Sequence, residues 1–323
     1  MITIGNVRIA TNVFLAPLSG CSDLAFRLIA REHGAGFCFF EMIDSHSLPY
    51  QRPRTLDILA THPKDSPRAA QLLGNDPGRM LKAAKIVLER TGSAFIDVNC
   101  ACPSKKVVRR GAGAALLKDP ANLYRILETL ASGLTVPVTI KMRIGYEKTD
   151  RDAIIAFAKG CESAGASALF VHGRTQAQGY MGEIDYAAIR AIKESVAVPV
   201  FGSGNIVTAW MAKKMFDETG CDGITVARGT LGNPWIFKEI EAILGRGDAP
   251  PRAHSLARRK AVLATHLDYV DRYKKIRPVS KVGFMRKVVI WYTTGLPGAT
   301  SLRRRISLAK TYPALLDIIN SLS

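Results

Sequence analysis

Residues 136–143 read Val136-Pro137-Val138-Thr139-Ile140-Lys141-Met142-Arg143, and a segment of helical period follows at 151–164. The first part is rich in β-branched residues, which favour a buried strand. In the second part apolar residues recur at three and four positions, the spacing of one face of a helix. A polar break separates the two parts, so this stretch predicts one strand-helix unit.

The same unit recurs along the chain up to residue 246. Apolar runs that predict strands lie at 12–16, 36–42, 68–73, 94–99, 136–142, 168–172, 198–202 and 222–227. Helical segments lie between them, for example at 208–219, where we expect Thr208 to cap the helix and Gly220 to end it. Eight such units predict an α/β protein with a (β/α)8 TIM barrel over residues 1–246. An open doubly wound sheet is the competing arrangement, but no G-x-G-x-x-G motif follows the first predicted strand.

The chain changes in character after Pro250-Pro251. Residues 257–273, 279–292 and 301–322 predict helices, without strand-like alternation between them. From residue 252 onward there are 15 Lys and Arg against three acidic residues, which is most of the formal net charge of +18. A solvated helical face can explain a charge run, but such a face usually carries balancing acids. We therefore expect residues 247–323 to form a small, basic, all-helical domain that binds a polyanion.

Composition disfavours several classes of protein. With 47% apolar residues, a chain of 323 residues can bury a sizeable core, which argues against disorder. The sequence has no uncharged apolar run of about 18 residues, and its start does not resemble a secretion signal. Six cysteines without a C-x-x-C spacing indicate neither a disulfide scaffold nor a zinc site. We expect a monomeric, cytoplasmic protein that holds no metal and does not enter the membrane.

In a barrel the active site lies at the carboxyl ends of the strands. Polar residues and glycines gather at the predicted ends: Pro17, Leu18, Ser19, Glu41, Gln71, Asn99, Cys102, Lys141, Arg143, His172, Arg174, Ser203, Gly204, Asn205, Ala227 and Arg228. The loops at 202–205 and 227–229 follow the last two strands, where barrels often bind phosphate through backbone N–H groups. Ordinary turn chemistry explains the glycines at 202–205 equally well.

Two of these side chains have alternative interpretations. Lys141 ends a buried strand, so it either extends to the rim or faces a ligand, as a Schiff-base amine or as a fixed positive charge. His172 lies at another strand end, where a histidine is more often a hydrogen-bonded structural group than a catalyst.

Cys102 differs from the other cysteines because it follows a strand, precedes a proline and lies near Lys105 and Lys106. The remaining thiols outside this loop are expected to be buried and inert: Cys21, Cys38, Cys161 and Cys221. The pair Cys100-x-Cys102 could suggest a metal, but the second spaced pair of a zinc site is missing.

Several motifs follow one another in a fixed order. They are Ala16-Pro17-Leu18-Ser19-Gly20 with Asp23 and Phe26-Arg27; Gln71-Leu72-Leu73-Gly74-Asn75-Asp76-Pro77; Asp97-Val98-Asn99; Cys102-Pro103-Ser104-Lys105-Lys106-Val107; Gly113-Ala114-Ala115-Leu116-Leu117; Lys141-x-Arg143; His172-Gly173-Arg174-Thr175; Ala227-Arg228-Gly229; and Gly232-Asn233-Pro234-Trp235-Ile236-Phe237. Together they resemble the tRNA-dihydrouridine synthase family, with a spelling closest to its bacterial B-type subfamily. The basic segment, with Arg286-Lys287, Trp291-Tyr292 and Arg303-Arg304-Arg305, is similar to the RNA-binding domain of that family.

The resemblance implies an FMN-dependent enzyme that reduces the C5=C6 bond of particular uridines in tRNA to 5,6-dihydrouridine, with electrons from NADPH. It implies hydride transfer from N5 of FMN to C6 and proton donation from Cys102 to C5. It assigns FMN contacts to Pro17, Leu18, Ser19, Gln71, Lys141, His172, Ser203, Gly204, Asn205, Ala227 and Arg228. It assigns the uracil to Asn99 and Arg143, and RNA contacts to Arg286 and Lys287.

Three positions depart from the usual spelling of the family. Cys100-Ala101 stands where Met-Gly is usual, Leu18 replaces a common Met, and Ala227 replaces a common Gly. None of these changes removes a reacting group. They concern the shape of the pocket and the detail of the phosphate loop.

Other functions fit parts of the sequence. A flavin barrel acting on a free small molecule explains the strand ends but not the basic segment, and a catalytically inactive RNA-binding protein explains the reverse. A Schiff-base aldolase would use Lys141. Ribosomal RNA is an alternative substrate to tRNA. With either RNA, the target base has to be turned out of its stack, because a barrel pocket cannot reach into a helix.

Overall fold

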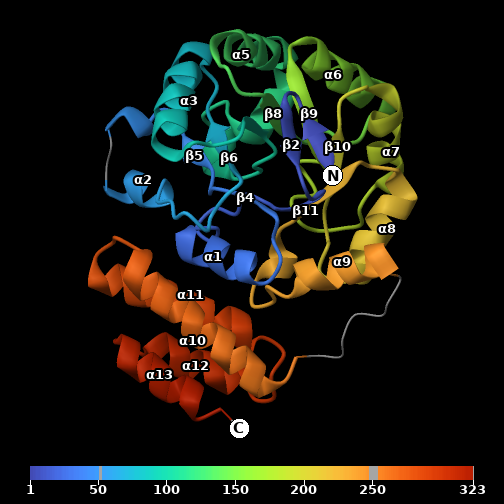
Figure 1. Ribbon diagram of the computed structural model, residues 1–323. Helices are drawn as coiled ribbons and strands as arrows, with labels where there is room; N and C mark the ends of the chain where they lie inside the picture. Colours follow the sequence, from blue (N-terminus) through green and yellow to red (C-terminus); the bar gives the residue numbers. More distant parts are fainter. Residues whose placement is uncertain (51–52, 247–253, 323) are drawn as a thin grey trace.

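The computed structural model describes residues 1–50, 53–246 and 254–322 and shows a closed barrel followed by a bundle of helices (Figure 1). The strands of the barrel are β3 (Val13–Leu15), β4 (Phe37–Phe39), β5 (Ile43–Asp44), β6 (Arg68–Leu73), β7 (Ile96–Cys100), β8 (Val138–Arg143), β9 (Ala166–His172), β10 (Val200–Ser203) and β11 (Gly223–Val226). They pair in parallel in the order β4-β3-β11-β10-β9-β8-β7-β6-β5, and a β4–β6 pairing closes the cylinder. The fold expected from the sequence, a TIM barrel with C-terminal helices, is confirmed.

The second predicted strand is the one that differs from expectation. The run 36–42 is not continuous, because β4 ends at Phe39 and β5 begins at Ile43. β4 pairs with β3 and with the start of β6, whereas β5 pairs with the end of β6. Two short strands therefore occupy one position in the barrel, and the irregular segment between them carries Glu41 and Met42.

A hairpin that the sequence analysis did not predict closes the amino-terminal end of the barrel. It consists of β1 (Ile2–Ile4) and β2 (Val7–Ile9), which pair antiparallel. In Figure 1 it lies across the middle of the barrel. Its buried isoleucines join an aromatic cluster inside the cylinder: Phe14, Phe37, Phe39, Phe95, Phe170 and Phe201. This half of the barrel is a packed apolar core, so a ligand can enter only from the other end.

Helices surround the barrel, and most of them begin at a capping side chain. They are α1 (Leu24–Glu32), α2 (Pro53–Ile58), α3 (Pro77–Thr91), α4 (Lys105–Val108), α5 (Pro120–Gly133), α6 (Arg151–Ser163), α7 (Tyr186–Ser195), α8 (Ala209–Thr219) and α9 (Ile236–Arg246), with 3-10 turns at Leu48–Tyr50, Gly113–Lys118 and Arg228–Thr230. Thr208 caps α8 and Gly220 ends it in the left-handed conformation, as expected. The side chains of Asp23, Asp76, Asp119, Asp150 and Asp185 cap other helices, each such cap contributing about 1 kcal/mol.

The C-terminal bundle is formed by α10 (Leu256–Tyr273), α11 (Pro278–Thr293), α12 (Ala299–Leu308) and α13 (Tyr312–Asn320). The prediction of a single helix over 301–322 is wrong, because α12 ends before Ala309 and Thr311 caps α13. Pro313 explains the break, since proline cannot donate the backbone hydrogen bond that a continuous helix needs there. The predicted domain boundary at residues 246–247 adjoins the segment 247–253, which lies outside the described residues. No helix in the described ranges is both long and apolar enough to span a bilayer.

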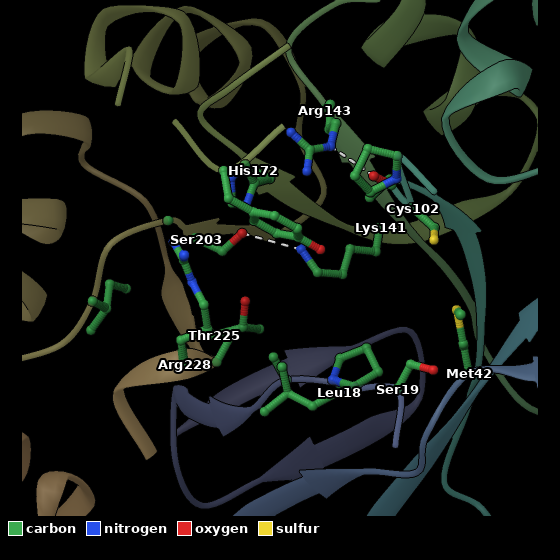
Figure 2. Close-up of a pocket in the computed structure, with 18 of the residues that line it drawn as sticks. Leu18, Ser19, Met42, Cys102, Lys141, Arg143, His172, Ser203, Thr225 and Arg228 are labelled. Carbon is green, nitrogen blue, oxygen red and sulfur yellow. Dashed lines mark hydrogen bonds between the residues drawn. The ribbon is translucent and has the colours of Figure 1, made fainter. Parts of the chain in front are cut away.

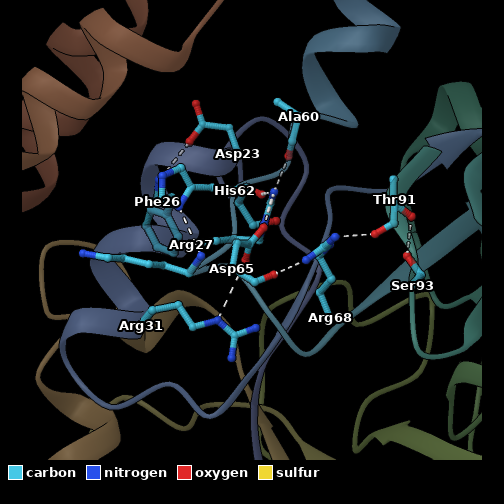
Figure 3. Close-up of polar contacts among 12 residues, drawn as sticks. Asp23, Phe26, Arg27, Arg31, Ala60, His62, Asp65, Arg68, Thr91 and Ser93 are labelled. Carbon is cyan, nitrogen blue, oxygen red and sulfur yellow. Dashed lines mark hydrogen bonds and ion pairs between the residues drawn. The ribbon is translucent and has the colours of Figure 1, made fainter.

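Arg27 of the Phe26-Arg27 motif has a structural part. Its side chain is fully buried and donates from Nε and Nη2 to Oδ2 of Asp65, at 3.0 and 2.8 Å (Figure 3). It also donates to the carbonyls of Ser22 and Ala60, both at 2.8 Å. These bonds join α1 to the segment before β6 and so fix the start of α1, against which the bundle packs.

The bundle docks on α1 through buried contacts (Figure 1). Lys274, at the end of α10, donates to Asp23 at 2.8 Å and to Asp57 at 3.1 Å. Burial alone would lower the pKa of Lys274, but the two carboxylates outweigh burial and raise it. Phe26 presents edge contacts to His266 and Trp291, with ring centroids 5.7 Å apart in each case. Bundle and barrel are therefore held together by apolar packing around a paired charge.

Candidate active site at the carboxyl end of the barrel

A cavity of about 350 Å³ opens at the carboxyl ends of the strands (Figure 2). Every barrel residue that the sequence analysis assigned to cofactor, substrate or catalysis lines it: Pro17, Leu18, Ser19, Gln71, Asn99, Cys102, Lys141, Arg143, His172, Ser203, Gly204, Asn205, Ala227 and Arg228. The cavity has the size and the mainly apolar lining of a small-molecule site.

The period of the strands explains why polar groups gather here. Inward-facing residues alternate along a strand. On β9 the buried Phe170 of the aromatic cluster is followed two residues later by His172, and on β10 Phe201 is followed by Ser203. The next inward-facing layer of side chains along the barrel axis is therefore polar. It forms the floor of the cavity, above the aromatic core.

Lys141 reaches into the cavity from β8. Its Nζ donates to Oγ of Ser203 at 3.2 Å (Figure 2). Ser203 donates in turn to the carbonyl of Val171. Burial lowers the pKa of Lys141 to about 8, with partial compensation from Asp97. The ammonium is thus directed at the cavity, and it is not extended to the rim as the structural alternative supposed.

A chain of hydrogen bonds leads from Asp97 to the loop that carries Cys102. Gln71 Nε2 donates to Asp97 Oδ2 at 2.7 Å, and Asn99 Nδ2 donates to Gln71 Oε1 at 2.7 Å. Asn99 Oδ1 then accepts from the backbone N–H groups of Ala101 and Cys102, at 3.1 and 2.9 Å. Because the carboxylate of Asp97 only accepts hydrogen bonds, it fixes the orientation of the side-chain amides of Gln71 and Asn99. Asn99, the last member of this series, holds the backbone of Cys102. Burial raises the pKa of Asp97 to about 6, against the hydrogen bonds from Gln71 and Thr139.

Cys102 is the partly exposed thiol of the cavity, whereas Cys100 is buried. Burial raises the pKa of Cys38 to about 12 and also raises that of Cys161, in agreement with their expected inert character. The expectation of full burial is wrong for Cys21, which is partly exposed because it lies in the loop between β3 and α1. In the ranges 1–50, 53–246 and 254–322, no three His, Cys, Asp or Glu side chains are grouped to hold a metal ion.

Two buried arginines hold the loop between β9 and α7. Arg143 donates to the carbonyls of Ala101, Thr175 and Gly179, at 2.7, 2.7 and 2.8 Å. Arg174 donates to the carbonyls of Met181 and Gly182 in the same loop. Most of the hydrogen-bonding capacity of Arg143 is thus used within the protein, a role that its sequence position did not indicate.

Tyr180 is a cavity residue that the sequence analysis missed. It lies on the loop held by the two arginines, with its ring 5.6 Å from the guanidinium of Arg143 and 5.0 Å from that of Arg228. It lies in the loop that follows the end of β9 at His172, beyond the motif at 172–175 that the sequence analysis considered. Other lining residues to which the sequence analysis gave no role lie at or near strand ends and carry no charge: Met42, Ala101, Pro103, Ile206, Val207 and Thr225.

Two polar atoms in the cavity wall are buried without a partner. They are Nε2 of His172 and Oγ1 of Thr225. Burial, together with Lys141 and Arg143, holds the pKa of His172 well below its usual value, so the ring is neutral at physiological pH. A buried polar group without a partner costs about 1–3 kcal/mol, so this wall is built to be completed by a polar ligand.

The loops after β10 and β11 present free backbone donors. The N–H groups of Gly204, Asn205, Arg228 and Gly229 bond to no acceptor in the described part of the chain. Arg228 lies beside them, with Nη2 3.3 Å from Oδ1 of Asn205. Gly204 has a φ of +127°, and a Cβ there would lie 2.3 Å from Ile184. A glycine at 204 is therefore needed for the packing of this loop. The N–H groups at 204, 205, 228 and 229 form a cradle for an anion.

Arg286 and Lys287 lie outside the cavity lining. Arg286 donates to the carbonyl of Ser307 at 2.7 Å within the bundle. Lys287 donates to the carbonyl of Gly20 in the barrel. Both side chains thus take part in internal hydrogen bonds, and their contact with RNA stays a prediction.

Comparison with known proteins finds relatives over almost the whole chain. The family described as dihydrouridine synthase (Dus) matches residues 14–318. The tRNA-dihydrouridine synthase B of Pseudomonas aeruginosa is 36% identical over 307 residues, which cover 95% of this chain and 91% of that protein. The probable tRNA-dihydrouridine synthase of Rickettsia prowazekii is 37% identical over 312 residues, covering 96% and 94%.

Solved structures share the fold at low sequence identity. The 6-hydroxypseudooxynicotine amine oxidase of Pseudomonas geniculata has a TM-score of 0.58 at 14% identity, over 75% of this chain and 49% of that one. The old yellow enzyme homologue of Zymomonas mobilis has a TM-score of 0.51 at 14% identity, over 78% and 93%. These likenesses concern the fold alone.

Proposed function

The chain belongs to the dihydrouridine synthase family, and from this we propose that it reduces the C5=C6 bond of uridines in tRNA to 5,6-dihydrouridine, with FMN as cofactor and NADPH as electron donor. The observation that carries the proposal is the cavity itself. It joins a thiol, a lysine of lowered pKa and an anion cradle in one space. The protein would work in the cytoplasm, where tRNA is modified.

The cavity fits a flavin mononucleotide. The cradle at 204–205 and 228–229 would bind the phosphate, and the unpartnered His172 and Thr225 would meet polar atoms of the cofactor. Lys141 would place its positive charge at the polar edge of the ring, where it stabilises the anionic reduced form. When bound, the flavin supplies the hydride that adds to C6 of the uracil.

Cys102 would supply the proton to C5. Its thiol lines the cavity, and the bonds from Asn99 fix the backbone on which it is mounted. Such fixed placement is a requirement of general acid catalysis, which contributes about 10²–10⁴-fold to rate. Asn99 therefore positions the acid, in addition to any contact with the base. Nη2 of Arg143 bonds to no acceptor in the described ranges, so it is left for a carbonyl of the uracil.

The RNA would bind to two basic segments, one on the bundle and one on the barrel. On the bundle, Arg303, Arg304 and Arg305 are exposed on α12. On the barrel, Lys105 and Lys106 are exposed on α4, directly after the Cys102 loop. Phosphates held on two sides leave one unstacked base to enter the cavity, which is the geometry that chemistry on a base requires.

The test compares Cys102→Ala with Cys161→Ala, a buried thiol on α6 that does not line the cavity. Both variants are loaded with FMN and given NADPH and unmodified tRNA transcript, and dihydrouridine is measured by mass spectrometry after digestion. We expect Cys102→Ala to bind flavin and tRNA normally and to lose at least about 10²-fold in turnover. Normal turnover by this variant would refute the assignment of the acid.

The same assay separates the other candidate functions. Equal activity on free uridine would indicate a small-molecule reductase, and a protein that takes up no FMN would indicate an RNA-binding role. Trapping of a carbonyl substrate on Lys141 by borohydride would indicate an aldolase. Ribosomal RNA offered in parallel with tRNA identifies which RNA is the substrate.

A further inference from the structure

Helix α11 of the bundle contacts two of the loops that form the cavity wall. Near its middle, Lys287 donates a hydrogen bond from Nζ to the carbonyl of Gly20, in the loop after β3. One turn later, the backbone of Trp291 lies against Gly232, where a Cβ would be 2.2 Å from the carbonyl of Trp291. Gly232 lies just after the 3-10 turn Arg228–Thr230, and Arg228 lines the cavity. A single helix of the bundle therefore supports the cavity from two sides.

The setting of Lys287 is that of an internal tether. Its ammonium lies 4.3 Å from the ring centroid of Phe284 and 5.3 Å from that of Trp291, so two aromatic faces cover it. The side chain is only partly exposed and makes no ion pair with a carboxylate within the described residues. The ammonium is thus engaged within the protein, on one carbonyl and two aromatic rings.

Gly20 is fixed on both of its peptide units. Its N–H donates to the carboxylate of Glu41, which is buried, and its carbonyl accepts from Lys287. Gly20 has a φ of +70°, in the left-handed region. Two bonds thus lock a glycine that would otherwise have wide conformational freedom.

The position of Gly20 is transmitted to the cavity through a tight turn. The N–H groups of Cys21 and Ser22 both donate to the carbonyl of Leu18, at 2.9 and 3.0 Å. Oγ of Ser22 accepts from the N–H of Leu18 at 3.0 Å. Leu18 and Ser19 themselves line the cavity. A shift at Gly20 therefore moves the residues that would face the cofactor.

We infer that Lys287 is a positioning residue for the cofactor: by holding the carbonyl of Gly20 it sets the loop 17–20 against the flavin, and so it couples docking of the bundle to affinity for FMN. The inference rests on the proposed function, because it concerns the flavin of that same cavity. It assigns to Lys287 a task different from binding RNA, the task that its place in a basic segment suggested.

The experiment compares Lys287→Met with Lys281→Met. Lys281 lies on the same helix, and its Nζ also donates to a backbone carbonyl, that of Asp271, but within the bundle. The two variants lose the same charge from the same helix. FMN affinity is measured by quenching of flavin fluorescence on apoprotein, and KM for tRNA is measured at saturating FMN.

We expect Lys287→Met to raise the Kd for FMN about tenfold, the usual effect of losing one charge-assisted hydrogen bond, and Lys281→Met to leave it unchanged. KM for tRNA should be equal in the two variants. Lys287→Arg should restore most of the affinity, because a guanidinium also donates to a carbonyl. Gly20→Ala strains the same loop at its positive φ and places a Cβ 3.6 Å from Nζ of Lys287, so it should weaken FMN binding too.

An unchanged Kd for FMN in Lys287→Met would overturn the inference. So would a higher KM for tRNA in Lys287→Met than in Lys281→Met with FMN affinity intact, since Lys287 would then be an RNA ligand. If the wild-type protein binds no FMN, the proposed function fails first, and the inference fails with it.

Discussion

The burial of His266 at the junction of barrel and bundle predicts that the free energy of unfolding falls in acid. The imidazole is buried between Phe26 of the barrel and Trp291 of the bundle, and its Nδ1 lies 3.2 Å from the hydroxyl of Tyr292. Its Nε2 is buried without a partner. Burial lowers the pKa of His266 to about 4, and the nearby Asp23 offsets only a small part of this effect. The folded protein therefore holds this ring neutral.

The sign and the size of the effect follow from linkage. The unfolded chain protonates this histidine at its ordinary pKa of 6.5, whereas the folded chain resists until about pH 4. Stability from a neutral His266 is thus fully present above pH 6.5 and is lost as the pH falls toward 4. At about 1.4 kcal/mol per pKa unit, the loss amounts to about 3 kcal/mol.

Asp97 makes a contribution of opposite sign in the same range. Its pKa is raised from 3.8 to about 6 in the folded protein, so its ionisation destabilises the fold as the pH rises through 6. In the wild-type protein the two effects partly cancel, so its free energy of unfolding would depend only weakly on pH. Since the two groups are in different parts of the molecule, comparison with a variant at 266 isolates the histidine.

The assay is urea unfolding of the wild type and of His266→Gln across this pH range. Glutamine can keep a hydrogen bond to Tyr292 but does not titrate. We expect the free energies of unfolding to converge in acid, with the wild type losing about 3 kcal/mol relative to the variant between about pH 7 and pH 4. Parallel curves for the two proteins would refute the claim that burial of His266 makes the junction sensitive to acid.

Three further predictions concern other parts of the molecule. Asp65→Ala should lower the free energy of unfolding by about 3–5 kcal/mol, because it leaves the guanidinium of Arg27 buried and unpaired; a loss in urea unfolding below about 1 kcal/mol would contradict this. Turnover should decline as the pH rises through about 8, where Lys141 loses its charge, and a profile of kcat against pH for Lys141→Gln should lack that decline; its persistence would assign it to another group. Affinity for tRNA should fall with salt, and replacing both Lys105 and Lys106 by Met should reduce the slope of log Kd against log salt by about two; a binding titration with an unchanged slope would place the RNA elsewhere.

The strand ends were predictable because two short-range rules apply to them. Alternation along a strand and the closure of parallel strands bring residues such as Gln71, Lys141 and His172 to one place, whatever the helices between them do. The lining of the cavity agrees with this for every barrel residue assigned to cofactor, substrate or catalysis, whereas Glu41 and Arg174, also at predicted strand ends, do not line it. The hairpin at residues 2–9 and the break between β4 and β5 were not predictable in this way. Their strands are too short to show a periodicity, and they form because of the strands they pair with.

The amino-acid sequence by itself determined the repeating unit, the barrel, the surplus of positive charge after residue 252 and the identity of the residues at the strand ends, since periodicity and composition are local properties. The contacts between those residues became known only from the folded structure. In the folded protein Arg143 bonds to the backbone of neighbouring loops, Tyr180 lines the cavity, and Lys287 bonds to Gly20, a residue 267 positions away. The physical reason is that a hydrogen bond depends on distances of about 3 Å between groups far apart in sequence, which no local pattern specifies.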